Sequence, residues 1–323
     1  MKILSVVSFA ALALMAAAPS QVRAQAYPDH PVRIVLPFGA GGVADITARI
    51  VAEALSNQLK QRFVVENAPG AGGIAAARAV LSSPADGYTL AMLTNGTAIS
   101  VPLFKSLPFN PVTDFMPISS LGYFDFVIGT NPESGLKTLA DAVKLAKEKP
   151  DALNTGTINI GSSQNLSAEL LRTSAGIKFT VIPYRGTPEV IVGVLRNDVQ
   201  IMIDSYSAMK SNLQEKKIIP LATTGKTRSQ SLPDVPTVGE AGVPGYEVLS
   251  WNALFAPKGT PQPIVDTLNK ALQTILADPE IKKKLLELGI EAKASTPAEI
   301  AGRLNDDIKK WGAVIEAANI PKQ

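Results

Sequence analysis

The chain has 323 residues, a formal net charge of +3, one histidine and no cysteine. This near-neutral charge argues against nucleic acid as a partner, because nucleic-acid binding normally needs a concentrated basic surface. Without cysteine, and with His30 near the start of the chain as the sole histidine, the sequence excludes disulfides, thiolate nucleophiles, Ser–His–Asp triads and His-ligated metal centres, so we expect no catalytic residue, metal or cofactor.

Residues 1–24 carry the three parts of a secretory signal peptide: a basic start at Lys2, an apolar run over 3–18, and small residues ending at Ala24. We expect cleavage after Ala24, or alternatively after Ala26. An uncleaved membrane anchor is less favoured, because the apolar run is shorter than the ~20 residues that a membrane span needs. The two basic residues of this segment would leave with it, which lowers the net charge to +1. We expect a soluble periplasmic protein, with no cysteine to carry a lipid anchor.

After the predicted signal peptide, strand and helix patterns alternate, which is typical of an α/β fold. An apolar strand over 32–36 leads through a glycine-rich turn into a helix over 43–59, whose apolar residues share one face. Strands over 63–65 and 88–93 flank a second glycine run, 69–73, which opens a second helix. We assign the glycines of that run to helix packing.

The alternation continues around two long extended passages, 115–130 and 246–256. Between them we expect, in chain order, a helix over 139–146, a strand over 157–160, a helix beginning within 161–166, a strand over 179–182, a helix over 190–195, strands over 199–203 and 218–223, and a Pro- and Gly-rich loop over 232–245. Two amphipathic helices, 264–276 and 300–315, follow the second passage.

The two extended passages predict a split α/β architecture, in which both passages cross between two lobes and form a two-strand hinge. Residues 25–124 and 251–323 would make the first, discontinuous lobe, and residues 125–250 the second. A cleft between such lobes is a favoured ligand site, and closure of the hinge around the ligand is a common motion.

The main candidate site residues lie where strands turn into helices. Such a turn points backbone N–H groups and the positive end of a helix dipole at one spot, which suits an anion. The candidate turns are Phe38, Gly39, Ala40, Gly41, Gly42 and Asp45 in the first lobe, and Gly161, Ser162, Ser163 and Asn165 in the second. A purely structural alternative stays open, in which the glycines only form a tight turn and Asp45 and the serines only cap helices.

Further candidates follow other strands. Thr94 and Asn95 come after the third predicted strand, at the carboxyl edge where α/β sheets bind ligands, and Asp204 ends a strand of the second lobe. Arg185 could pair with a carboxylate, or could serve only between the lobes. His30 is expected to be a solvated residue at the entrance of the first strand.

Short motifs run through the chain in a fixed order. They are Tyr27-Pro28, Pro31-Val32-Arg33, Pro37-Phe38 with Gly41-Gly42 and Asp45, Val64-Val65-Glu66-Asn67 with Pro69-Gly70-Ala71-Gly72-Gly73, Asp86-Gly87-Tyr88-Thr89-Leu90, Pro183-Tyr184-Arg185-Gly186, Leu232-Pro233-Asp234-Val235-Pro236-Thr237, and Pro244-Gly245-Tyr246-Glu247 with Trp251. Each motif alone is weak, but together they are specific. On these motifs the chain resembles the Bug-type periplasmic solute receptors, the extracytoplasmic components of tripartite tricarboxylate transporters.

The resemblance implies a two-lobed receptor of the periplasmic-binding-protein, or Venus flytrap, fold that captures a small organic acid. It implies that the ligand loops are 38–45 and 161–165, the same two turns that the residues indicate. A carboxylate held between two helix ends gains backbone hydrogen bonds and dipole interactions of about 0.3–1 kcal/mol each, so no lysine or arginine is required. The family's second loop often carries a histidine where this chain has Asn165, an amide that cannot become cationic.

We therefore expect a monomer that captures a small carboxylate, either a dicarboxylate or an aromatic acid, for uptake through a tripartite tricarboxylate membrane permease. Two alternatives stay open. The receptor could present its ligand to a sensor kinase instead. Less favoured is a periplasmic enzyme that acts on a carboxylate through Asp45 or Asp204, because neither has a histidine or cysteine to assist it.

Overall fold

The computed structural model describes residues 27–150 and 152–323. The predicted signal peptide, residues 1–24, and both of its expected cleavage sites lie outside the described residues. Within the described ranges, the helices are all too short or too polar to cross a membrane.

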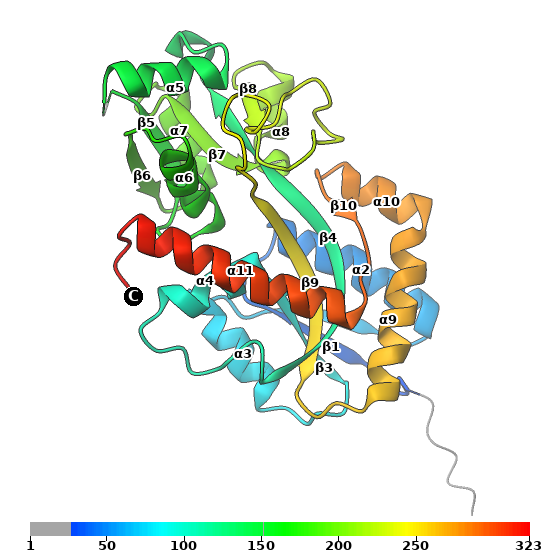
Figure 1. Ribbon diagram of the computed structural model, residues 1–323. Helices are drawn as coiled ribbons and strands as arrows, with labels where there is room; N and C mark the ends of the chain where they lie inside the picture. The colour runs from blue at the N-terminus through cyan, green and yellow to red at the C-terminus, as the bar shows by residue number, and fades with distance from the viewer. Residues whose placement is uncertain (1–26, 151) are drawn as a thin grey trace, which may run out of the picture.

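The described strands form one ten-stranded sheet in the order β2-β1-β3-β9-β4-β7-β5-β6, with β10 and β8 also paired to β4. The strands are β1 (Val32–Leu36), β2 (Phe63–Asn67), β3 (Thr89–Thr94), β4 (Phe115–Thr130), β5 (Asn154–Ile158), β6 (Thr180–Tyr184), β7 (Ile201–Ser205), β8 (Ile219–Thr223), β9 (Leu249–Pro257) and β10 (Glu291–Ala292). The set β1, β2 and β3 is parallel, and so is the set β5, β6 and β7, whereas β4 and β9 run antiparallel to their neighbours. Two parallel α/β units are therefore joined through β4 and β9 (Figure 1).

Helices pack against both units. They are α2 (Val43–Leu59), α3 (Ile74–Leu81), α4 (Asn95–Leu103), α5 (Leu139–Glu148), α6 (Ser163–Ser174), α7 (Thr187–Leu195), α8 (Tyr206–Gln214), α9 (Gln262–Ala277), α10 (Pro279–Leu286) and α11 (Pro297–Ala317), with short 3-10 turns η1 (Ala71–Gly73) and η2 (Pro132–Ser134). The last helix, α11, contacts α4 and β4 and also reaches α6 of the second unit, so it lies across the junction (Figure 1). Its fully buried Trp311 anchors it there.

The junction between the units lies within β4. Its residues up to Asp125 pair with β9, and its residues from Phe126 onward pair with β7 and β8. Thr224 is hydrogen-bonded to both crossing segments. Its Oγ1 accepts from Phe126 N (2.8 Å) and donates to the carbonyl of Val248 (2.8 Å). Its backbone N–H also donates to the carbonyl of Phe126, and its carbonyl accepts from Val248 N. These features confirm the predicted α/β fold with two lobes joined by a two-strand hinge.

Most predicted elements are present, with shifted ends. The strand over 32–36 and the helix over 43–59 have the expected bounds, whereas β5 begins three residues earlier than expected and β9 begins at Leu249 rather than at 246. The stretch 232–245, described throughout, contains turns and one isolated bridge at Thr237, as a loop should.

Three helices were not predicted. The residues of α4 are buried on several sides and include Pro102, so no single apolar stripe marks the helix. In α8, Met209 is the buried residue among exposed and half-buried ones, and α10 has eight residues, too few for a clear periodic pattern. The pattern that reveals an amphipathic helix is therefore weak in α4 and α8, and in α10 it extends over too few residues to stand out.

Candidate functional site

A cavity of about 570 Å³ opens between the lobes. It is lined by Phe38, Gly41, Gly42, Val43, Ala44, Ile46, Thr94, Gly96, Phe124, Phe126, Ile158, Ser162, Ser163, Gln164, Thr187, Asp204, Ser205, Ser207, Ala208, Ser250, Asn252 and Leu288. Five helices, α2, α4, α6, α7 and α8, begin at this wall. The first-turn N–H groups of a helix have no partner within the helix, so these five ends give the cavity a surplus of donors and positive dipole ends.

The first-lobe loop enters α2 through glycine. Gly41 has a φ of +88°, which a side chain would strain, and Gly42 is the N-cap without a side-chain cap. Asp45 is not in the cavity wall: its carboxylate accepts from Gly41 N (2.9 Å), from Asn67 Nδ2 (2.9 Å) and from Arg49 Nε (3.0 Å). The hydrogen bond from Arg49 is the main reason that the pKa of Asp45 falls to about 2. Asp45 is therefore an ionised internal brace of the loop.

The second-lobe loop repeats this geometry at the same spacing. Gly161 has a φ of +78°, and its N–H donates to Oδ1 of Asn165 (3.1 Å), four residues later, as Gly41 donates to Asp45. Ser162 caps α6 by accepting from Asn165 N (3.1 Å). Ser162 and Ser163 line the cavity, whereas Gly161 and Asn165 stand behind the wall.

Of the two candidates after β3, one lies in the cavity wall and the other behind it. Thr94 lines the cavity and caps α4 by accepting from Gly96 N (3.2 Å). Asn95 is fully buried behind it: its Nδ2 donates to Ser163 Oγ (2.8 Å) across the lobes, and its Oδ1 accepts from Trp311 Nε1 (2.7 Å). Asn95 therefore links α4, α6 and α11 rather than facing the cavity.

Asp204 lies in the wall at the end of β7 and is 2% exposed. Its oxygens accept from Gln164 Nε2 (3.1 Å), Thr187 Oγ1 (2.5 Å) and Ser205 N (2.7 Å), so it ties together the starts of α6, α7 and α8. Burial raises the pKa of Asp204, and the hydrogen bonds from its neighbours oppose that rise.

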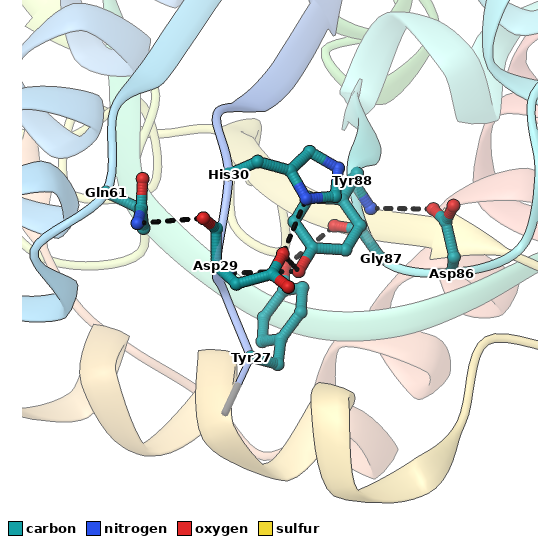
Figure 2. Close-up of polar contacts among 7 residues, drawn as sticks. All are labelled: Tyr27, Asp29, His30, Gln61, Asp86, Gly87 and Tyr88. Carbon is teal, nitrogen blue, oxygen red and sulfur yellow. Dashed lines mark hydrogen bonds and ion pairs between the residues drawn. The ribbon is translucent and has the colours of Figure 1, made fainter. Parts of the chain in front are cut away.

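Several predicted residues lie outside the wall. Gly39, Ala40 and Arg185 do not line the cavity, and Arg185 N donates to Glu189 instead (3.3 Å). Figure 2 shows His30 stacked on Tyr88 (centroids 3.5 Å apart), with Asp29 bonded to both. This cluster sits before the start of β1, whereas the cavity lies beyond its end.

Among the wall residues that sequence reasoning missed, two groups are instructive. Thr187, Ser205 and Ser207 stand at the starts of α7 and α8, and the strand-end rule that picked Asp204 would also have found them. Phe124 and Phe126 share one face of the hinge strand β4, because side chains alternate along a strand. Nothing local in the sequence marks that face as the cavity side.

The family model for the tripartite tricarboxylate transporter family receptor, TctC, matches residues 47–320. Rpa4515 of R. palustris, solved with adipate, is 34% identical, and the match covers 91% of this chain and 99% of that one with a TM-score of 0.82. The periplasmic binding protein BugD is 31% identical over 92% and 100% of the two chains, with a TM-score of 0.78. MatC (Rpa3494) from Rhodopseudomonas palustris, solved with malate, is 31% identical over 90% and 100%, with a TM-score of 0.77. The chain therefore belongs to the tripartite tricarboxylate transporter receptor family, TctC, as its Bug-type motifs indicated.

Proposed function

We propose that this chain is a periplasmic receptor that captures a small organic carboxylate between its lobes and delivers it to a membrane permease. The observation that carries the proposal is the convergence of five helix starts on one cavity, three of which (α2, α7 and α8) have no side-chain cap. Uncapped N–H groups at a helix start are suited to a carboxylate. The adipate and malate in Rpa4515 and MatC support the same chemical class.

The proposal assigns parts of the chain to this task. Residues 25–124 with 251–323, and residues 125–250, would be the two lobes, because β4 changes partners next to that boundary. The ligand carboxylate would meet the loop ends at Gly42 and Ser163, with Thr94 and Asp204 nearby in the wall. Asp45, Asn95 and Asn165 would hold the loops in shape. The receptor would work as an exported monomer and would release its ligand unchanged.

A thermal-shift screen of the chain from Gln25 onward, against mono-, di- and tricarboxylates and aromatic acids, tests the proposal. A ligand at a hundred times its dissociation constant should stabilise the folded state by about 2.7 kcal/mol. Gly42→Leu should abolish the shift, since a side chain at Gly42 meets no protein atom within 4 Å and would project into open space. Gly302→Leu, at an exposed and equally open glycine of α11, is the matched control and should leave the shift intact.

If no acid raises the melting temperature, and circular dichroism shows that the protein is folded, carboxylate capture is contradicted. Chemical conversion of a bound acid would contradict a receptor role. Deletion of the gene separates the two partners: loss of uptake supports the permease, and loss of an induced response with uptake intact supports a sensor kinase.

A further inference from the structure

The floor of the cavity is aromatic. Phe124 and Phe126, two residues apart on the hinge strand, both line the cavity, and their rings meet edge to face with centroids 5.8 Å apart at 82°. In the strand register, Phe124 lies opposite Ser250 of β9, and Phe126 lies opposite Ser205 of β7. We call Phe124 and Phe126 the hinge floor. It spans the junction, so a ligand lying on it touches the strand that both lobes share.

Apolar side chains extend this floor into the walls of both lobes. Ile46, one helical turn after the uncapped start of α2, lines the first-lobe side, and Ile158, just before the second-lobe loop, lines the other. Leu288, just beyond the end of α10, adds a further apolar contact. The cavity thus offers donors at the helix starts and apolar side chains from both lobes and from the hinge strand to the body of a ligand.

The charges of the wall disfavour a second carboxylate. Among the described lining residues no side chain is a lysine, arginine or histidine, and Asp204 is the one ionisable group. The three donors to Asp204 are all neutral. A first carboxylate can use the helix starts, but a second one lying over the hinge floor would be desolvated with no cationic side chain in the wall to pair with it.

We propose that the hinge floor makes this receptor selective for acids with a single carboxylate on an apolar, ring-sized body, and against dicarboxylates such as adipate and malate. The inference rests on the proposed function, because it places the ligand's carboxylate at the helix starts of the same cavity. Phe124 and Phe126 are then specificity residues, since aromatic ligands gain area burial and edge-to-face contact with them.

Titration calorimetry with benzoate, cyclohexanecarboxylate, adipate, malate and terephthalate tests the ligand class. We expect each single-carboxylate ring acid to bind at least ~10-fold more tightly than adipate or malate, and terephthalate to bind more weakly than benzoate, which differs from it by one carboxylate. Tighter binding of adipate, malate or terephthalate than of both ring acids overturns the inference while leaving carboxylate capture intact. Failure of all five acids to bind contradicts the proposed function itself.

Phe124→Ala tests the role of the floor. Phe124 is half-buried, so the variant should fold, and we expect it to weaken benzoate by ~10-fold while changing any measurable adipate affinity by less than ~3-fold. Phe104→Ala, at a half-buried phenylalanine that packs beside Gly72 outside the cavity, is the matched control and should change neither affinity. An equal loss for both ligands in Phe124→Ala, or no loss for benzoate, overturns the assignment of the floor as the selective element. Phe124→Leu keeps an apolar floor of similar size and should restore most of the affinity for cyclohexanecarboxylate.

Discussion

Asp125 is buried on the opposite face of β4 from the hinge floor, because side chains alternate along the strand. It lines a second, small pocket of about 160 Å³, which Phe124 also borders, together with Lys226, Arg228 and Glu247. Its Oδ2 is buried and has no hydrogen-bond partner among the described residues. Burial, the dominant cause, raises the pKa of Asp125 from 3.8 to about 6.

The consequence for stability follows from proton linkage. Between about pH 4 and pH 6 the folded protein keeps the proton on Asp125 and the unfolded chain has released it, so the free energy of unfolding falls as the pH rises through this window. Each pH unit within this window lowers the free energy of unfolding by about 1.4 kcal/mol. The total loss is about 3 kcal/mol, and it persists above pH 6. Asp125→Asn replaces the carboxylate by a neutral group of the same shape. At pH 7 the free energy of unfolding of the variant should therefore exceed that of the wild type by up to about 3 kcal/mol. This gain is an upper bound, because burying the amide of the asparagine still has a cost.

Urea denaturation followed by circular dichroism between pH 4 and pH 8 measures this difference. For a chain of this size, 3 kcal/mol corresponds to roughly 5 °C in melting temperature at pH 7, with the two proteins converging near pH 4. Asp306→Asn, at an exposed aspartate of α11, should follow the wild type at every pH. The reasoning is refuted if Asp125→Asn is less stable than the wild type at pH 7. It is also refuted if the free energy of unfolding of the variant falls between pH 4 and pH 6 as steeply as that of the wild type.

Three further predictions concern stability. Trp311→Phe should lower the free energy of unfolding by about 1–3 kcal/mol in urea denaturation, because it leaves Oδ1 of the buried Asn95 without its donor; an unchanged midpoint would contradict this. Gly41→Ala should lower the free energy of unfolding by about 1–2 kcal/mol, because Gly41 has a φ of +88° that strains a side chain. Gly42→Ala, at a φ of −82°, should change it by less than about 0.5 kcal/mol. Equal melting temperatures of the two variants would show that the turn is not strained. Gly129→Ala should cost about 1–3 kcal/mol by calorimetry, because its Cβ would overlap buried methionine and isoleucine side chains, and a neutral result would mean that the sheet relaxes freely there.

The parts of the fold that were predictable are those with a local signal. The apolar face of α2 repeats over 17 residues, and β1 is a short apolar run next to a glycine turn, so both have the expected bounds. By contrast, α4 depends on its surroundings: it carries Pro102 and buries polar Asn95, which only contacts with α6 and α11 make acceptable. Local patterns cannot report such distant partners.

The same division holds for the candidate site. Gly42 and Ser163 could be named because a strand-to-helix turn is visible in the sequence, and both lie in the cavity wall. That Asp45 lies outside the cavity wall could not be predicted, since its position depends on Arg49 and Asn67 reaching the same carboxylate. Phe124 was missed because its exposure to the cavity is set by the pairing of β4 with β9, whose residues follow more than a hundred positions later.

The clamp formed by Thr224 limits how the receptor can open. Since one side chain bonds both crossing segments, at Phe126 and Val248, the two strands enter the second lobe as a single unit and cannot bend independently. On the first-lobe side of the clamp, β4 and β9 remain paired with each other from Asp125 and Leu249 onward, so the two crossing strands form one continuous ribbon. We expect a hinge built as one ribbon to move as a unit, which would bring the two ligand loops back to the same positions each time the cleft shuts.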